Sequence, residues 1–167
     1  MNEFSDALID TGKKGKIPKE YDWFGFLIGE WDILYSDNHG TGRERQVKGE
    51  WIFSWVLDGT AIQDVFICPS RAERQIHPQP DATWGTTLRI FNPGTKAWDI
   101  FYGATGEAER LEAKKEGDDI VLTETGEGKM KWIFSDIRDN YFLWENRLFN
   151  EDGSSQLQCR IVGSRRK

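Results

Sequence analysis

The chain has 167 residues with 28 acidic and 22 basic side chains, a net charge of −6, and 13% aromatic residues that include eight Trp. This length predicts one domain with a sizeable core. The negative charge argues against nucleic-acid binding, because neutralising phosphates requires a basic surface. No apolar run approaches the roughly 20 residues of a transmembrane helix, and residues 1–19 lack the apolar segment of a signal peptide. The sequence therefore predicts a cytoplasmic protein without a membrane partner.

The N-terminal region divides into a polar tail and an apolar segment. Residues 1–20 hold only a weak helical pattern and a Gly/Lys run, so we expect a mobile or loosely docked tail before a single domain of residues 21–167. Residues 21–27 carry five aromatic or aliphatic side chains. They predict a helical turn that covers one end of the domain.

Almost all of the chain after residue 29 alternates short strand-like runs with turn residues. The predicted strands cover residues 31–36, 43–57, 60–68, 83–91, 96–104, 107–115, 120–125, 128–137, 141–149 and 156–163. No helical stretch is long enough to connect parallel strands. About ten antiparallel strands are therefore expected, and a sheet of this size tends to close into a barrel or to split into a sandwich.

The dipeptide Asp58-Gly59 is a strong hairpin signal, because both central positions of a type I′ turn need positive φ. A two-residue loop at this dipeptide predicts three cross-strand pairs on one face: Trp55 with Ile62, Phe53 with Asp64, and Trp51 with Phe66. Asp64 is then a carboxylate among large rings, which is costly unless a hydrogen bond or a cation compensates its desolvation. Arg89, in an otherwise neutral strand, is the best candidate partner.

The segment Gly29-Glu30-Trp31 follows an apolar run and resembles the Gly-x-Trp signature that opens the first strand of lipocalins and their calycin relatives. In that pattern the Trp closes one end of the barrel, and an Arg from the end of the barrel stacks on it through the attraction of guanidinium to an indole face. The resemblance implies that Trp31 is buried at one end and that Arg160 lies over its indole. The alternative is an ordinary buried Trp and a solvated Arg.

Three longer segments, residues 26–31, 49–65 and 85–93, are similar to a family of uncharacterised bacterial lipocalin-like proteins of the calycin superfamily. The similarity covers most of residues 22–104. It implies an all-β fold, an antiparallel up-and-down lipocalin-like barrel of about ten strands with a short N-terminal helical lid. It implies no established reaction and supplies no catalytic residues.

Chemistry-bearing motifs are sparse. His39, Cys68, His77 and Cys159 are scattered without metal-ligand spacing, and the sequence contains no nucleophile elbow, phosphate loop or dinucleotide glycine pattern. We therefore expect no metal and no cofactor. Residues 69–82 form the longest irregular segment, which is typical of a lid or binding element and nearly as often of a mobile connector.

Aromatic faces with a few embedded polar groups are typical of a small-molecule pocket, and barrel mouths are a common place for one. Any single Trp, however, is more often part of a filled core, because aromatic side chains mostly pack. We expect a small apolar or aromatic ligand in the barrel. The predicted ligand-binding residues are Trp51, Phe53, Trp55, Phe66, Arg89, Trp98 and Trp144.

Three functional hypotheses differ in the role that they give to Asp64. With Arg89 it can bind the polar end of an apolar ligand in a simple binding protein. With a raised pKa it can instead be the catalytic acid or base of a cofactor-free isomerase or cyclase. If it belongs to a structural ion pair or points to solvent, the chain is an interaction module with a filled core. The sequence leaves homodimerisation open.

Overall fold

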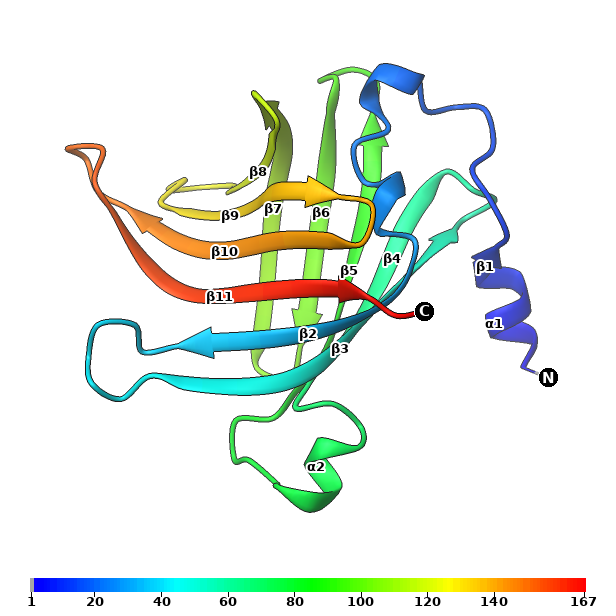
Figure 1. The fold of residues 1–167 in the computed structure, drawn as a ribbon. Coiled ribbons are helices and arrows are strands. Elements are labelled where there is room, and N and C mark those ends of the chain that lie inside the picture. Colours follow the sequence, from blue (N-terminus) through cyan, green and yellow to red (C-terminus); the bar gives the residue numbers. More distant parts are fainter. Residues whose placement is uncertain (1) are drawn as a thin grey trace.

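The computed structural model describes residues 2–167, which form one closed antiparallel barrel of ten strands (Figure 1). The strands are β2 (Gly29–Asp37), β3 (Arg45–Val56), β4 (Ala61–Cys68), β5 (Thr83–Asn92), β6 (Ala97–Ala104), β7 (Glu107–Glu116), β8 (Asp119–Glu124), β9 (Met130–Arg138), β10 (Tyr141–Phe149) and β11 (Ser155–Arg165). The remaining elements are α1 (Glu3–Leu8), β1 (Ile9–Asp10), the 3₁₀ helices η1 (Lys19–Tyr21) and η2 (Gly25–Leu27), and α2 (Glu73–Ile76).

Each strand of the barrel pairs with its neighbours in the sequence, and β11 pairs with β2 to close the ring. This up-and-down order confirms the predicted fold class. Closure gives every one of the ten strands two partners, so the ring has no exposed edge. No helix within residues 2–167 is long and apolar enough to cross a membrane.

The β3–β4 hairpin has the predicted register, with Trp55 opposite Ile62 and Phe53 opposite Asp64. The chain reverses over residues 57–60, where Gly59 has a φ of +67°. A Cβ on Gly59 would lie 2.3 Å from the Gly12 carbonyl oxygen, so both the turn and the close approach of the N-terminal segment require glycine here. The register directs Asp64 into the barrel.

The N-terminal helices close one end of the barrel, as expected. Phe24 and Leu27 from the η2 region are fully buried, and Tyr21 stacks on Phe91 of β5 at 5.2 Å between ring centroids. Gly29 (φ +122°) turns the chain into β2, and the Trp31 indole N–H donates to the Leu27 carbonyl at 2.7 Å. We call this the closed end.

The arginine over Trp31 is Arg165, so the prediction of Arg160 is wrong. The Arg165 guanidinium lies 4.3 Å from the Trp31 ring centroid and donates to the carbonyls of Ile28, at 2.7 Å, and of Phe26. Register gives the reason, since Arg165 is opposite Trp31 in the β2–β11 ladder. Arg160 lies five residues nearer the other end of the barrel and pairs with Glu145 at 2.7 Å.

The segment before the barrel contacts it at several points. β1 pairs with the end of β3 through Ile9–Val56 and Asp10–Trp55, beyond the last β2 partner of that strand. The Lys14 backbone N–H donates to the Gly59 carbonyl at 3.0 Å, and Ile17 is buried in the core. Residues 8–17 of the predicted tail thus contact the barrel along one side, whereas α1 has no buried side chain.

Candidate functional site

Asp64 and Arg89 form a buried ion pair inside the barrel, as the sequence suggested. Arg89 Nη1 donates to Asp64 Oδ2 at 2.7 Å, and the Thr87 backbone N–H donates to Asp64 Oδ1 at 3.0 Å. The pair comes from adjacent strands, with Asp64 opposite Thr87 in the β4–β5 ladder. Both side chains are almost completely shielded from solvent. Asp64 therefore does not point outward.

Aromatic rings surround this pair. The Arg89 guanidinium lies 5.4 Å from the Phe24 ring and 5.2 Å from the Phe53 ring, and Trp51 Nε1 faces the Asp64 carboxylate without reaching hydrogen-bond geometry. Burial raises the pKa of Asp64, and the Arg89 charge opposes that rise. The surrounding rings separate this ion pair from solvent.

The other predicted site residues all face the barrel interior, and most are packed in the core. Trp98 belongs to the closed end, where its indole N–H donates to the Tyr21 carbonyl at 2.8 Å. Trp51 packs on Phe53, Phe66 and Trp144 with ring centroids 5.1, 5.3 and 5.9 Å away. Trp55 is buried near the start of the β3–β4 turn. Of the predicted set, Phe66 is the residue that lines a described cavity.

That cavity, of about 200 Å³, lies at the end of the barrel opposite the closed end, which we call the mouth. Inward-facing strand residues form one side of it, and the β4–β5 loop, residues 69–82, forms the other. Its lining residues are Tyr35, Arg45, Val47, Phe66, Cys68, Pro69, Gln79, Asp81, Thr83 and Glu107. The cavity suits part of a small ligand and is smaller than most drug-sized sites.

Arg45 holds the β4–β5 loop against the mouth. Its Nη2 lies 2.8 Å from Asp37 of β2 and 2.5 Å from Asp81 of the loop, and its Nη1 donates to Gln79 at 3.2 Å. The same loop is tied to β3 by Arg71, which binds Glu50 through two nitrogens at 2.8 and 3.0 Å. The sequence left open whether this loop is a lid, a binding element or a mobile connector. These contacts fit a lid over the mouth.

The mouth continues inward as a half-buried aromatic wall that the sequence analysis missed. Trp132 of β9 lies 5.5 Å from Tyr102 and 5.6 Å from Trp144 between ring centroids. Glu109 is opposite Tyr102 and Asn146 is opposite Trp132, so both face the same interior. Alternation contained a signal for Glu109, because it shares parity with the buried Leu111 of β7.

Several polar atoms of the barrel interior are unsatisfied. Within residues 2–167, the buried side-chain atoms without a hydrogen-bond partner are Trp51 Nε1, Arg89 Nε, Trp132 Nε1 and Asn146 Oδ1. The last two belong to the mouth, on paired positions of β9 and β10. Buried polar atoms normally find a partner in protein, water or ligand, so this pair marks a place where a bound molecule would gain hydrogen bonds.

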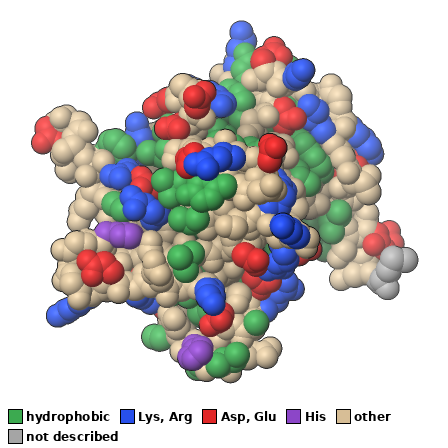
Figure 2. Space-filling model, in the orientation of Figure 1, with side chains coloured by type: hydrophobic (Ala, Val, Ile, Leu, Met, Phe, Trp, Pro, Cys, Tyr) green, Lys and Arg blue, Asp and Glu red, His purple; other side chains and the backbone are tan. Residues whose placement is uncertain are grey.

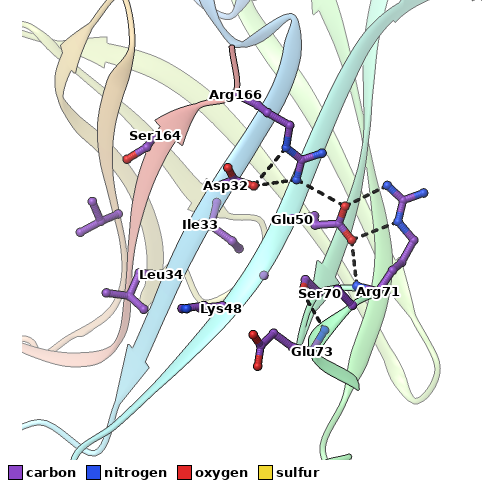
Figure 3. A pocket seen from close by; sticks show the side chains of 13 residues that line it. Asp32, Ile33, Leu34, Lys48, Glu50, Ser70, Arg71, Glu73, Ser164 and Arg166 are labelled. Carbon is purple, nitrogen blue, oxygen red and sulfur yellow. Dashed lines mark hydrogen bonds and ion pairs between the residues drawn. The ribbon is translucent and has the colours of Figure 1, made fainter. Parts of the chain in front are cut away.

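A second, larger groove of about 730 Å³ lies on the outside of the barrel, between the faces of β2, β3 and β11 and the α2 loop (Figure 3). In Figure 3, Glu50 lies between Arg71 and Arg166, and hydrogen bonds connect it to both. The Arg71 guanidinium holds the pKa of Glu50 down to about 2. Figure 2, in the orientation of Figure 1, shows apolar side chains bordered by charged ones on this side of the molecule. Most of the groove's charges are thus already paired.

Comparison with known proteins supports the fold and leaves the activity open. No protein-family model matches the sequence, and no curated protein matches it. The crystal structure of Rv2717c from M. tuberculosis superposes with a TM-score of 0.60 at 12% identity, covering 91% of this chain and 100% of that chain. The S-type phycobiliprotein lyase CPES from Guillardia theta superposes with a TM-score of 0.58 at 11% identity, covering 92% and 99%. At these identities the similarities show the shared lipocalin-like barrel fold alone.

Proposed function

We propose that the protein binds a small, largely apolar or aromatic molecule at the mouth of the barrel. The supporting observation is the combination of half-buried rings with two unsatisfied polar atoms, Trp132 Nε1 and Asn146 Oδ1, on the interior wall. Tyr102 connects this wall to the cavity, because it packs on Trp132 and its hydroxyl donates to the cavity-lining Glu107 at 3.1 Å. A ligand here covers apolar ring surface and supplies the missing hydrogen bonds. Trp51 and Trp144 form the floor of this site, and Asp64 and Arg89 lie beneath it.

The indole N–H groups provide a direct test, because each Trp gives one side-chain signal in a ¹H–¹⁵N NMR spectrum. We expect titration with neutral compounds such as 2-phenylethanol and cyclohexanol to shift the Trp132 signal. The signals of Trp31 and Trp98 serve as internal controls, since their N–H groups are hydrogen-bonded at the closed end. Assignment by single Trp→Phe variants identifies each signal. Shifts confined to Trp31 and Trp98, or no shift with any compound, would contradict the proposal.

A cofactor-free isomerase or cyclase that uses Asp64 is the second candidate. It is favoured by the raised pKa of this buried carboxyl, and one of the proteins with the same fold is the phycobiliprotein lyase CPES. The two candidates respond differently to Asp64→Asn. That substitution spares ligand binding at the mouth but abolishes acid–base turnover of any substrate found. Turnover that survives Asp64→Asn would exclude Asp64 as the acid or base.

Several broader assignments accompany this proposal. Membership of the family of uncharacterised bacterial lipocalin-like proteins rests on residues 26–31, 49–65 and 85–93. A cytoplasmic location and the lack of nucleic-acid and membrane partners rest on composition and charge. A homodimer is an open option that analytical ultracentrifugation would decide.

A further inference from the structure

The charges around the mouth are unbalanced. Two carboxylates of β7, Glu107 and Glu109, face the interior, since they pair with Ala104 and Tyr102. Glu107 lines the cavity and accepts a hydrogen bond from the Tyr102 hydroxyl at 3.1 Å. Within residues 2–167, neither carboxylate has an ion-pair partner, and Glu109 accepts no hydrogen bond from a side chain or backbone group outside the strand ladders.

The cationic side chains of this region already have partners. Arg45 lines the cavity, and its guanidinium is shared between the carboxylates of Asp37 and Asp81. A second guanidinium, that of Arg74, donates to the carbonyls of the cavity-lining residues Pro69 and Thr83. The mouth therefore has four carboxylates, Asp37, Asp81, Glu107 and Glu109, against two guanidinium groups, an excess of two negative charges. Burial and the negative charges of Glu107, Asp64 and Glu109 raise the pKa of the Tyr102 hydroxyl. A cleft with charge of one sign concentrates ions of the opposite sign.

The walls of the mouth suit the same kind of ion. Trp132 and Tyr102 are half-buried rings in edge-to-face contact on the interior wall, and aromatic faces attract cations, Trp most strongly. The unpartnered Asn146 Oδ1 is a hydrogen-bond acceptor, as an ammonium group requires. Trp132 Nε1 is a donor without a partner, so it can donate a hydrogen bond to an oxygen atom elsewhere on the ligand. The indole is neutral and therefore does not repel a positively charged group.

We infer that the ligand bound at the mouth is an organic cation, an amine with an apolar or aromatic body whose ammonium group lies between Glu109 and the faces of Trp132 and Tyr102. This inference rests on the function proposed above and narrows its ligand class. It also changes the expected polar contact from the Asp64–Arg89 pair, which is internally compensated, to the uncompensated carboxylates of β7.

The test compares three soluble probes with the same phenyl group: 2-phenylethylamine (cationic at neutral pH), 2-phenylethanol (neutral) and phenylacetate (anionic). We expect the amine to bind about tenfold more tightly than the alcohol at low salt, and phenylacetate to bind most weakly. Added sodium chloride should weaken binding of the amine and leave that of the alcohol unchanged. The Trp132 indole signal and intrinsic Trp fluorescence report binding.

Matched variants on one strand isolate the charge. Glu109→Gln should weaken the amine about fivefold to tenfold without affecting the alcohol. Glu112→Gln is the control, because Glu112 is on the same strand, faces outward and pairs with Lys114 at 3.0 Å. Urea denaturation of both variants checks that the barrel is intact.

Two different failures can be distinguished. The inference of a cationic ligand is wrong if the alcohol or phenylacetate binds as tightly as the amine, or if only other neutral compounds bind. It is also wrong if Glu109→Gln leaves the affinity for the amine unchanged. In each of these cases the proposal of a binding site at the mouth still holds. If no compound of any charge shifts the Trp132 signal, the proposed function itself is wrong.

Discussion

The closed end and the mouth are built from the same ten strands, yet they differ in how their polar atoms are satisfied. At the closed end the indole N–H groups of Trp31 and Trp98 donate to backbone carbonyls, and Phe24 is fully buried between Trp98 and Arg89. At the mouth Trp132 Nε1 and Asn146 Oδ1 have no partner within residues 2–167, and Glu109 has no cation. One end is completed by its own chain, and the other is arranged for a molecule from outside.

The largest difference between the ends should appear when one ring is removed from each. Phe24→Ala leaves a cavity in fully packed surroundings and should lower the free energy of unfolding by about 4 kcal/mol. Phe66→Ala removes a half-buried ring that lines a pre-existing cavity and should cost about 1–2 kcal/mol. Urea denaturation of both variants measures the two values. Equal losses would show that the mouth is packed as tightly as the closed end.

A smaller effect tests the arginine that completes the closed end. Arg165→Ala removes the guanidinium over Trp31 and its hydrogen bonds to two carbonyls, and should destabilise the protein by about 2 kcal/mol. Arg160→Ala is the matched control from the same strand and should cost less than about 1 kcal/mol, because Arg160 makes a partly exposed ion pair with Glu145. Thermal unfolding ranks the two, and the reverse order would restore Arg160 as the closing residue.

The smallest expected effect concerns the loop over the mouth, and it depends on pH. The pKa of Glu50 is about 2 in the folded protein against an ordinary 4.5, with the Arg71 hydrogen bond as the main cause. Because the folded pKa is the lower one, the pair stabilises the protein above pH 4.5, and this stabilisation is lost as the pH falls toward 2. Arg71→Ala should therefore lower the urea midpoint slightly at neutral pH and not near pH 2. A difference that grows with acidification would contradict this assignment.

Local signals predicted much of the fold. Asp58-Gly59 and the flanking alternation were sufficient for the β3–β4 register, because a hairpin is determined by residues close in sequence. The choice between Arg160 and Arg165 depended on the β2–β11 register, which joins distant segments, and the β10–β11 ladder contains an irregularity next to Asn146. Alternation put Arg165 on the face of the buried Ile161 and Arg160 on the opposite face, but it did not show which residue of this strand lies opposite Trp31.

The candidate site was harder to predict for a different physical reason. The inward direction of Asp64 followed from the hairpin, and its pairing with Arg89 followed from the cost of an unpaired buried charge. Whether an inward-facing residue is packed in the core or lies near the mouth depends on its position along the barrel axis. The alternation of apolar and polar residues does not give that position. Trp51 and Trp132 are both Trp residues within predicted strands, yet Trp51 is packed in the core and Trp132 reaches the mouth.

Ring closure through β2 and β11 has a consequence for how the chain reaches its native state. Successive hairpins join residues close in sequence, whereas the hydrogen bond from Arg166 to Asp32 at this seam joins residues 134 positions apart. Closing so long a loop has the highest entropic cost of any pairing in the barrel, and folding rates fall as such non-local contacts become necessary. During synthesis β2 to β10 can pair before β11 leaves the ribosome. Until then β2 and β10 are open edges that other chains can extend, so the final strand protects the nascent protein from aggregation.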